Sequence, residues 1–301
     1  MDPVLRAALL SWEWRVEVIV PLVTLAALYV SGWRRLRRRG ARQATRWRLV
    51  SYLAGLFFLA LSLLSPIDLL SQQLFFVHMI QHLLQIMIAP PLLLLANPLP
   101  VMLWGLPTDD LRRRVGGGLS TLLHRESGFR RGLRAATSPG VIWLFWVIVV
   151  VGWHDPEAYN AALRSRVLHD LEHILFFAAG MLFSWHVVGA GPRIHKQFGL
   201  IGRIAFVLSA IPPNMALGVF LAFADSTIYT YYDAVPRLWG ISTVTDQRIG
   251  GVIMWVPGNM MYIIAALILV TRLMRQSDKS RARESAARES REVLTTPGLE
   301  R

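Results

Sequence analysis

The sequence contains no cysteine among its 301 residues. Disulfides, thiolate metal sites and thiol redox chemistry are therefore excluded, and a metal ion could be held only by nitrogen, oxygen or thioether sulfur. The sequence also lacks an internal repeat, a glycine-rich phosphate loop and a nucleophilic Ser/His/Asp arrangement. We therefore predict that the protein turns over no substrate and is not an enzyme.

Acidic residues are few, with 19 Asp and Glu against 32 Lys and Arg, and the formal net charge is +13. The basic residues lie in short loops between apolar stretches, which is a topology signal and gives no reason to expect nucleic-acid binding. The chain is 54% hydrophobic, with a mean hydropathy of +0.42. These values predict an integral membrane protein, and the amino terminus shows no small-residue cleavage site of a removable signal peptide.

Seven segments are apolar enough to cross a hydrocarbon core of about 30 Å, which needs about 20 helical residues. We predict an all-α, polytopic membrane domain over residues 1–275, followed by a cytoplasmic tail over 276–301 that is either disordered or a loosely surface-bound helix. The fourth segment is short unless it begins near Thr137. The predicted spans are 17–33, 47–64, 74–95, 141–153, 168–188, 200–224 and 250–272.

The orientation follows from the basic residues, because positive charge is retained on the cytoplasmic side. Alternate connections and the carboxyl-terminal tail hold 26 of the Lys and Arg residues, whereas the other connections and the amino terminus hold 6. This division places the amino terminus outside and the carboxyl terminus in the cytoplasm. Prolines at 90 and 91, at 212 and 213, and at 257 should kink three of the spans.

Two pairs of histidines stand one helical turn apart, His78 with His82 and His169 with His173. Residues i and i+4 share one helix face, so each pair could direct its nitrogens at one ion. The predicted orientation brings both pairs and His154 to the outer leaflet. Ionisable side chains inside a membrane are rare and usually face the bundle interior or a pathway.

Neutral imidazole is a good ligand for copper and zinc, and paired imidazoles on facing helices can also hold haem. The predicted outer segments carry 11 acidic residues against 6 basic ones, a balance that attracts cations. Asp155, which follows His154, and Asp246, which heads the last span, could each orient a ligand imidazole through its second nitrogen.

Several motifs resemble those of the CtaG-like cytochrome c oxidase assembly factors. They are HMIQH with the following IAPPLLLLANPLP, then WHDPEAYNAAL leading into HDLEHILFFAAGMLFSW, and then DQRIGGVIMW. The resemblance implies a multi-pass protein of the bacterial plasma membrane that assembles a haem-copper oxidase through its copper centres. Asn97 stands where a glycine is expected, and His186 stands where the family tends to have proline. The positions matching the family are His78, His82, His154, His169, His173, Asp246 and Gln247.

We therefore predict that the protein binds copper at its outer face and helps deliver it to the oxidase. The expected partners are oxidase subunits, an extracytoplasmic copper donor and the lipid bilayer. Two alternatives stay open, namely a haem-binding electron-transfer protein with axial histidines and a copper or proton transporter. The predicted metal ligands are His78, His82, His154, His169 and His173. The residues predicted to support these ligands without binding the metal themselves are Asp155, Glu172, Asp246 and Gln247.

Overall fold

The computed structural model describes residues 11–191, 194–195 and 199–294, and every regular element in these residues is a helix. Six helices are long and apolar enough to cross a membrane, or seven if the bent pair Gly128–Ala136 and Pro139–Trp153 forms one span. The predicted all-α membrane fold is confirmed. Which side of the membrane each end faces stays a prediction.

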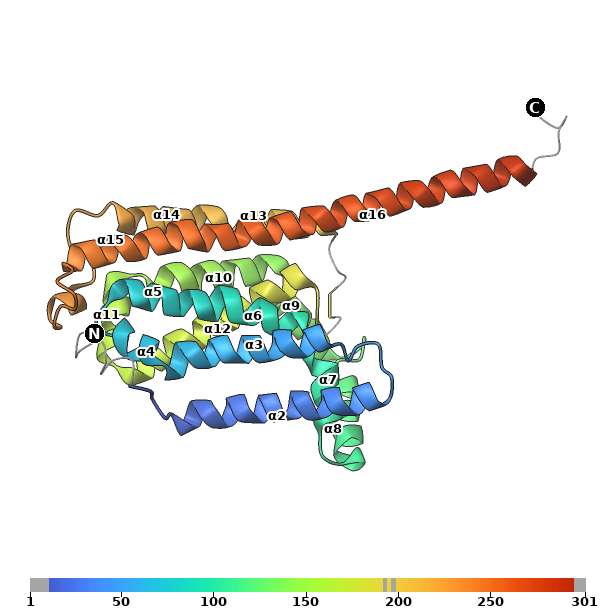
Figure 1. Ribbon diagram of the computed structural model, residues 1–301, viewed down its shortest axis with the longest axis horizontal. Coiled ribbons are helices and arrows are strands. Elements are labelled where there is room, and N and C mark those ends of the chain that lie inside the picture. Colours follow the sequence, from blue (N-terminus) through green and yellow to red (C-terminus); the bar gives the residue numbers. More distant parts are fainter. Residues whose placement is uncertain (1–10, 192–193, 196–198, 295–301) are drawn as a thin grey trace.

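The long helices lie side by side along the long axis of Figure 1. We call the end that holds α4 and α11 the histidine end, and the opposite end, where α7 to α9 lie, the basic end. The bundle helices are α2 (Val16–Arg38), α3 (Arg46–Leu64), α5 (Phe75–Leu83), α6 (Ala89–Leu95), α10 (Pro139–Trp153), α12 (Arg166–Val188), α13 (Leu200–Leu208), α14 (Ile211–Ala222), α15 (Thr243–Ile253) and α16 (Asn259–Leu294). The short helices are α4 (Pro66–Ser71), α7 (Pro98–Gly105), α8 (Asp109–Leu122), α9 (Gly128–Ala136), α11 (Pro156–Arg164) and the 3₁₀ turn η2 (Thr230–Asp233).

All three proline positions interrupt their spans as predicted. The π-helical turn η1 (Leu84–Ile88) joins α5 to α6, and a second one, η3 (Met254–Gly258), joins α15 to α16. At the third position α13 ends at Leu208, and α14 begins at Ile211 with Pro212 in its first turn. Around η3, the Asn214 side chain donates a hydrogen bond to the Met254 carbonyl oxygen at 2.9 Å. A neighbouring helix thus supplies a partner for backbone at the interruption, as the absence of water in a membrane requires.

The predicted fourth span, 141–153, lies within α10, and the chain bends just before this helix. α9 and α10 meet at 52°, with Thr137 between them and Pro139 in the first turn of α10. Proline disfavours helical dihedrals in the residue before it, so Ser138 adopts an extended conformation and α10 keeps only 15 residues.

The span Phe75–Leu95, made of α5, η1 and α6, is the most deeply buried of the candidate spans in the described chain, with 72% of its apolar segment inside the bundle. It packs against α3, α12 and α15. Gly180 lets α12 approach it closely, because a Cβ there would lie 2.6 Å from the Ile86 carbonyl oxygen. The two spans that carry the histidine pairs are therefore in direct contact, through η1 and α12.

Asn97 occupies the position where the family resemblance leads us to expect glycine. Its φ of 49° lies in the left-handed region, which glycine adopts freely and asparagine tolerates better than most residues. The departure therefore keeps the turn between α6 and α7 intact. The other departure, His186, is buried, and its Nε2 donates to the Thr137 carbonyl oxygen at 2.9 Å.

α16 continues past residue 275 and projects far beyond the bundle in Figure 1. The sequence predicts either disorder or a loosely surface-bound helix for residues 276–301. Residues 276–294 are helix in the structure, which suits a stretch with many Ala, Glu and Arg residues and neither glycine nor proline. Residues 295–301 lie outside the described residues. The division of the chain at residue 275 stays a prediction.

Candidate metal centre

The five predicted histidines meet at the histidine end of the bundle. α5 directs His78 and His82 at α12, which presents His169 and His173, and ring centroids lie 5.2 Å apart for His78 and His169 and 5.8 Å apart for His82 and His173. His154 follows the last residue of α10, and its ring centroid lies 6.1 Å from that of His82. All five side chains are buried. Within each pair the rings lie on one helix face, as the i, i+4 spacing predicts, with centroids 4.3 Å apart for His78 and His82 and 4.2 Å apart for His169 and His173.

Glu172 lies inside this cluster. Its carboxylate is fully buried, with Oε1 at 3.5 Å from Nε2 of His82 and Oε2 at 3.9 Å from Nε2 of His78. The sequence predicts a supporting role for Glu172, whereas the structure places its carboxylate beside the imidazoles, in a group with His78 and His82 that could hold a metal ion. We call His78, His82, His169, Glu172 and His173 the histidine–glutamate cluster.

The polar atoms of this cluster fit a metal ion. The cluster leaves several buried polar atoms without a hydrogen-bond partner among the described residues, namely Nε2 of His78 and His169, both nitrogens of His82 and His173, and both oxygens of Glu172. Such atoms are costly to bury unless something compensates them, and a cation would be bound by one lone pair of each imidazole and by the carboxylate. The potential ligand atoms of His78, His169 and His173 lie within 4.8 Å of one another, and so do those of His78, His82 and Glu172.

Two tyrosines that sequence analysis missed determine which nitrogen of His78 is free. The Tyr232 hydroxyl donates to the Ser71 carbonyl oxygen at 2.8 Å, so it can only accept from the Tyr159 hydroxyl, 3.0 Å away. Tyr159 then accepts from Nδ1 of His78 at 2.7 Å. Burial raises the pKa of both hydroxyls far above the ordinary value, which keeps their protons in place. This chain leaves the lone pair of His78 on Nε2, the nitrogen that faces Glu172.

Three of the four predicted supporting residues have other roles. The Asp155 carboxylate accepts from the backbone N–H groups of Glu157 and Ala158 at the start of α11, and Nδ1 of His154 bonds instead to the Val150 carbonyl oxygen. Asp246 accepts from the first N–H groups of α5 and from Arg237. Gln247 accepts from the backbone N–H of Ile228 and so holds the loop before α15. These residues position helices and loops, and the hydrogen bonds described here for their side chains join backbone groups and Arg237.

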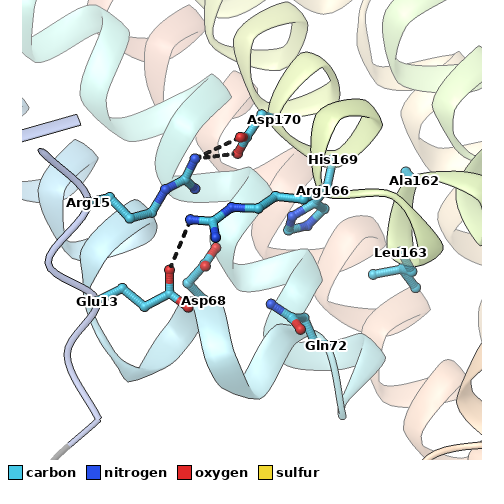
Figure 2. Close-up of a pocket in the computed structure, with 9 residues that line it drawn as sticks. All are labelled: Glu13, Arg15, Asp68, Gln72, Ala162, Leu163, Arg166, His169 and Asp170. Carbon is cyan, nitrogen blue, oxygen red and sulfur yellow. Dashed lines mark hydrogen bonds and ion pairs between the residues drawn. The ribbon is translucent and has the colours of Figure 1, made fainter. Parts of the chain in front are cut away.

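A cavity of about 240 Å³ opens beside the cluster at the histidine end, and His169 is one of its walls. Figure 2 shows Arg15 reaching both oxygens of Asp170, at 2.7 Å, while Arg166 faces Glu13 across the pocket at 3.9 Å. Three carboxylates, those of Glu13, Asp68 and Asp170, thus share the pocket with two guanidinium groups. The Asp68 carboxylate accepts from the Gln81 side chain at 2.7 Å, which connects the cavity wall to α5.

A family model described as cytochrome c oxidase caa3 assembly factor (Caa3_CtaG) matches residues 27–276. The chain belongs to this family. The match includes all five histidines of the site as well as Glu172, Asp246 and Gln247, and it ends close to the predicted boundary at residue 275. The resemblance noted in the sequence is thereby confirmed for the assembly-factor family.

The chain is also similar to longer curated proteins. It is 28% identical over 288 residues to an uncharacterized protein of Mycobacterium bovis and to one of Mycobacterium tuberculosis, which covers 94% of this chain and 42% of each relative. A Mycobacterium leprae protein is 26% identical over 279 residues, 90% of this chain and 41% of the relative. The chain spans about two fifths of the length of these relatives. No solved structure matches the chain.

Proposed function

We propose that this assembly factor binds copper in the histidine–glutamate cluster and passes it to a subunit of a haem-copper oxidase in the bacterial plasma membrane. The observation that carries the proposal is the set of buried imidazole and carboxylate atoms that have no hydrogen-bond partner in the described chain. Nitrogen and oxygen donors of this kind suit copper or zinc, and the family name supplies the link to an oxidase. The role is one of binding and delivery without turnover.

The division of basic residues supports an orientation with the histidine end outside and the basic end in the cytoplasm. In that orientation the cavity at Glu13, Asp68 and Asp170 is the entrance to the cluster, with His169 shared between them. The excess of carboxylates there attracts a cation from the outer side, where a copper donor would deliver it. Delivery to the oxidase requires only that ligands exchange one at a time.

Metal analysis of the detergent-purified protein tests the binding step. We expect His78→Ala and His173→Ala each to lower bound copper sharply, and the double variant to lose little more, because groups that act as a unit are not additive. His124→Ala is the matched control, since this exposed histidine lies in the loop between α8 and α9 at the basic end. Independent, additive losses would argue for separate sites.

A deletion strain tests delivery. The oxidase polypeptides should still be made but should lack copper, and excess copper in the medium should restore respiration in part. His169→Ala should reproduce the defect while inserting normally. If this variant binds no copper yet supports full oxidase assembly, delivery by this cluster is wrong.

Two observations bear on the alternatives. The ring centroids of His78 and His82 lie 4.3 Å apart, and those of His169 and His173 lie 4.2 Å apart. Rings of the two pairs also contact each other across the helices, so a planar haem has no space between the two pairs. A Soret band in the purified protein would nevertheless establish haem binding. The transporter alternative rests on the π-helical turns in two spans, because such turns are frequent at functional sites. Copper uptake into proteoliposomes would establish that activity.

A further inference from the structure

His154 lies apart from the two ligand groups of the histidine–glutamate cluster, and its own hydrogen bond determines its tautomer. Its Nδ1 lies 2.6 Å from the Val150 carbonyl oxygen. A carbonyl oxygen has no hydrogen to give, so Nδ1 must carry the proton. In the neutral imidazole the lone pair then resides on Nε2.

This lone pair faces an atom that cannot donate to it. Nε2 of His154 lies 3.4 Å from the thioether sulfur of Met79, which has lone pairs and no hydrogen. A second proton on the imidazole would relieve the mismatch, but no hydrogen bond or ion pair joins the His154 ring to a carboxylate in the described chain. An unpaired imidazolium at a site that is 5% exposed is costly, whereas a metal cation would be bound by both the imidazole lone pair and the thioether sulfur.

The surroundings offer the donors that such a cation needs. His154 and Met79 line a cavity of about 20 Å³, roughly the space of a single small ion or water. The same cavity is also lined by His82, Met87 and Met254. Both ring nitrogens of His82 lack hydrogen-bond partners in the described residues. Imidazole nitrogen with thioether sulfur is a soft donor set, which selects Cu(I) over Zn(II) and Cu(II).

We propose that His154 and Met79, together with His82 and the methionines lining the cavity, form a second metal site that is specific for Cu(I). His82 belongs to this soft site and also to the histidine–glutamate cluster, so an ion can move between the two sites by exchange of ligands around His82. The inference rests on the proposed function only for the choice of copper as the ion carried.

Silver(I), a redox-inert soft ion, is the probe for the soft site. We expect the purified full chain to bind it, and Met79→Leu to weaken this binding while leaving Zn(II) binding by the histidine–glutamate cluster unchanged. Removing a group that only supports a ligand lowers metal affinity about 10- to 100-fold, so loss of a ligand should cost at least about tenfold. Met215→Leu is the matched control, because Met215 is 43% exposed on α14 and does not line the cavity.

A second measurement needs no variant. In protein labelled with selenomethionine, X-ray absorption at the silver edge should show a selenium shell around the bound ion. Absence of this shell, or a Met79→Leu protein that binds silver as tightly as the natural chain, overturns the soft site. A different result would contradict the proposed function. In that case the His78→Ala variant would bind Zn(II) as tightly as the natural chain does.

Discussion

The carboxylate of Asp246 caps the helix that carries His78 and His82. It is fully buried, and it accepts from the backbone N–H groups of Phe75 and Phe76 at 3.0 Å each. The first N–H groups of a helix have no partner within the helix, and the N-cap residue of α5 makes no side-chain cap bond. α5 therefore depends on a carboxylate that lies about 170 residues away in the sequence. We predict that Asp246→Ala destabilises the fold and weakens metal binding together.

The magnitude follows from the contacts that are lost. Loss of an N-cap costs about 1 kcal/mol, and each hydrogen bond to a charged group contributes about 1.5–3 kcal/mol. The substitution also removes the partner of Arg237, at 2.9 Å, although that side chain is 23% exposed and can be solvated in part. We expect about 3 kcal/mol of lost stability. At about 2–4 °C per kcal/mol, the melting temperature should fall by about 6–12 °C.

Far-UV circular dichroism of the protein in detergent measures this change, and copper binding by the same samples measures the effect on the site. Asp225→Ala is the matched control, since its pair with Arg248, at 3.4 Å, is exposed, and such pairs contribute about 0–1 kcal/mol. If Asp246→Ala melts within about 4 °C of the natural protein, the largest shift that the control allows, then this carboxylate does not hold α5 in place.

Three further predictions follow from other parts of the fold. Gly180→Ala should weaken the contact between α12 and η1 and lower the melting temperature, whereas Gly152→Ala, where a Cβ meets nothing within 4 Å, should leave it unchanged; circular dichroism compares the two. Burial raises the pKa of Asp68 from 3.8 to about 6, so folding favours the protonated acid, and this contribution is fully present below about pH 4 and is lost as the pH rises through about 6. Asp68→Asn should therefore raise the melting temperature at pH 7.5, and this increase should shrink towards pH 4.5. Melting temperatures measured across this pH range test the prediction, and an increase that is the same at every pH would contradict it. A reporter that is active only outside the cytoplasm should work when fused after Glu157 and fail after Arg125, and the reverse result would refute the orientation.

Features that depend on neighbouring residues were predictable from the sequence. Hydrophobic length predicted the spans, proline predicted their interruptions at η1 and η3, and the i, i+4 spacing predicted that His78 and His82 share one face, as do His169 and His173. Each of these rests on backbone geometry within one helix, so no knowledge of packing is needed. Even the left-handed turn at Asn97 follows from a local conformational preference.

Features that join distant elements were decided by the tertiary structure alone. The sequence predicted a supporting role for Glu172, whereas in the structure its carboxylate lies beside His78 and His82, because this face of α12 packs against α5. The tautomer of His78 depends on Tyr159 and Tyr232, which come from α11 and η2, and the contact of His154 with Met79 joins residues 75 positions apart. No spacing rule connects such residues, because their distance is set by which helix faces pack together. The sequence by itself determined which ligands were available, and the packing of the bundle decided which of their atoms face one another.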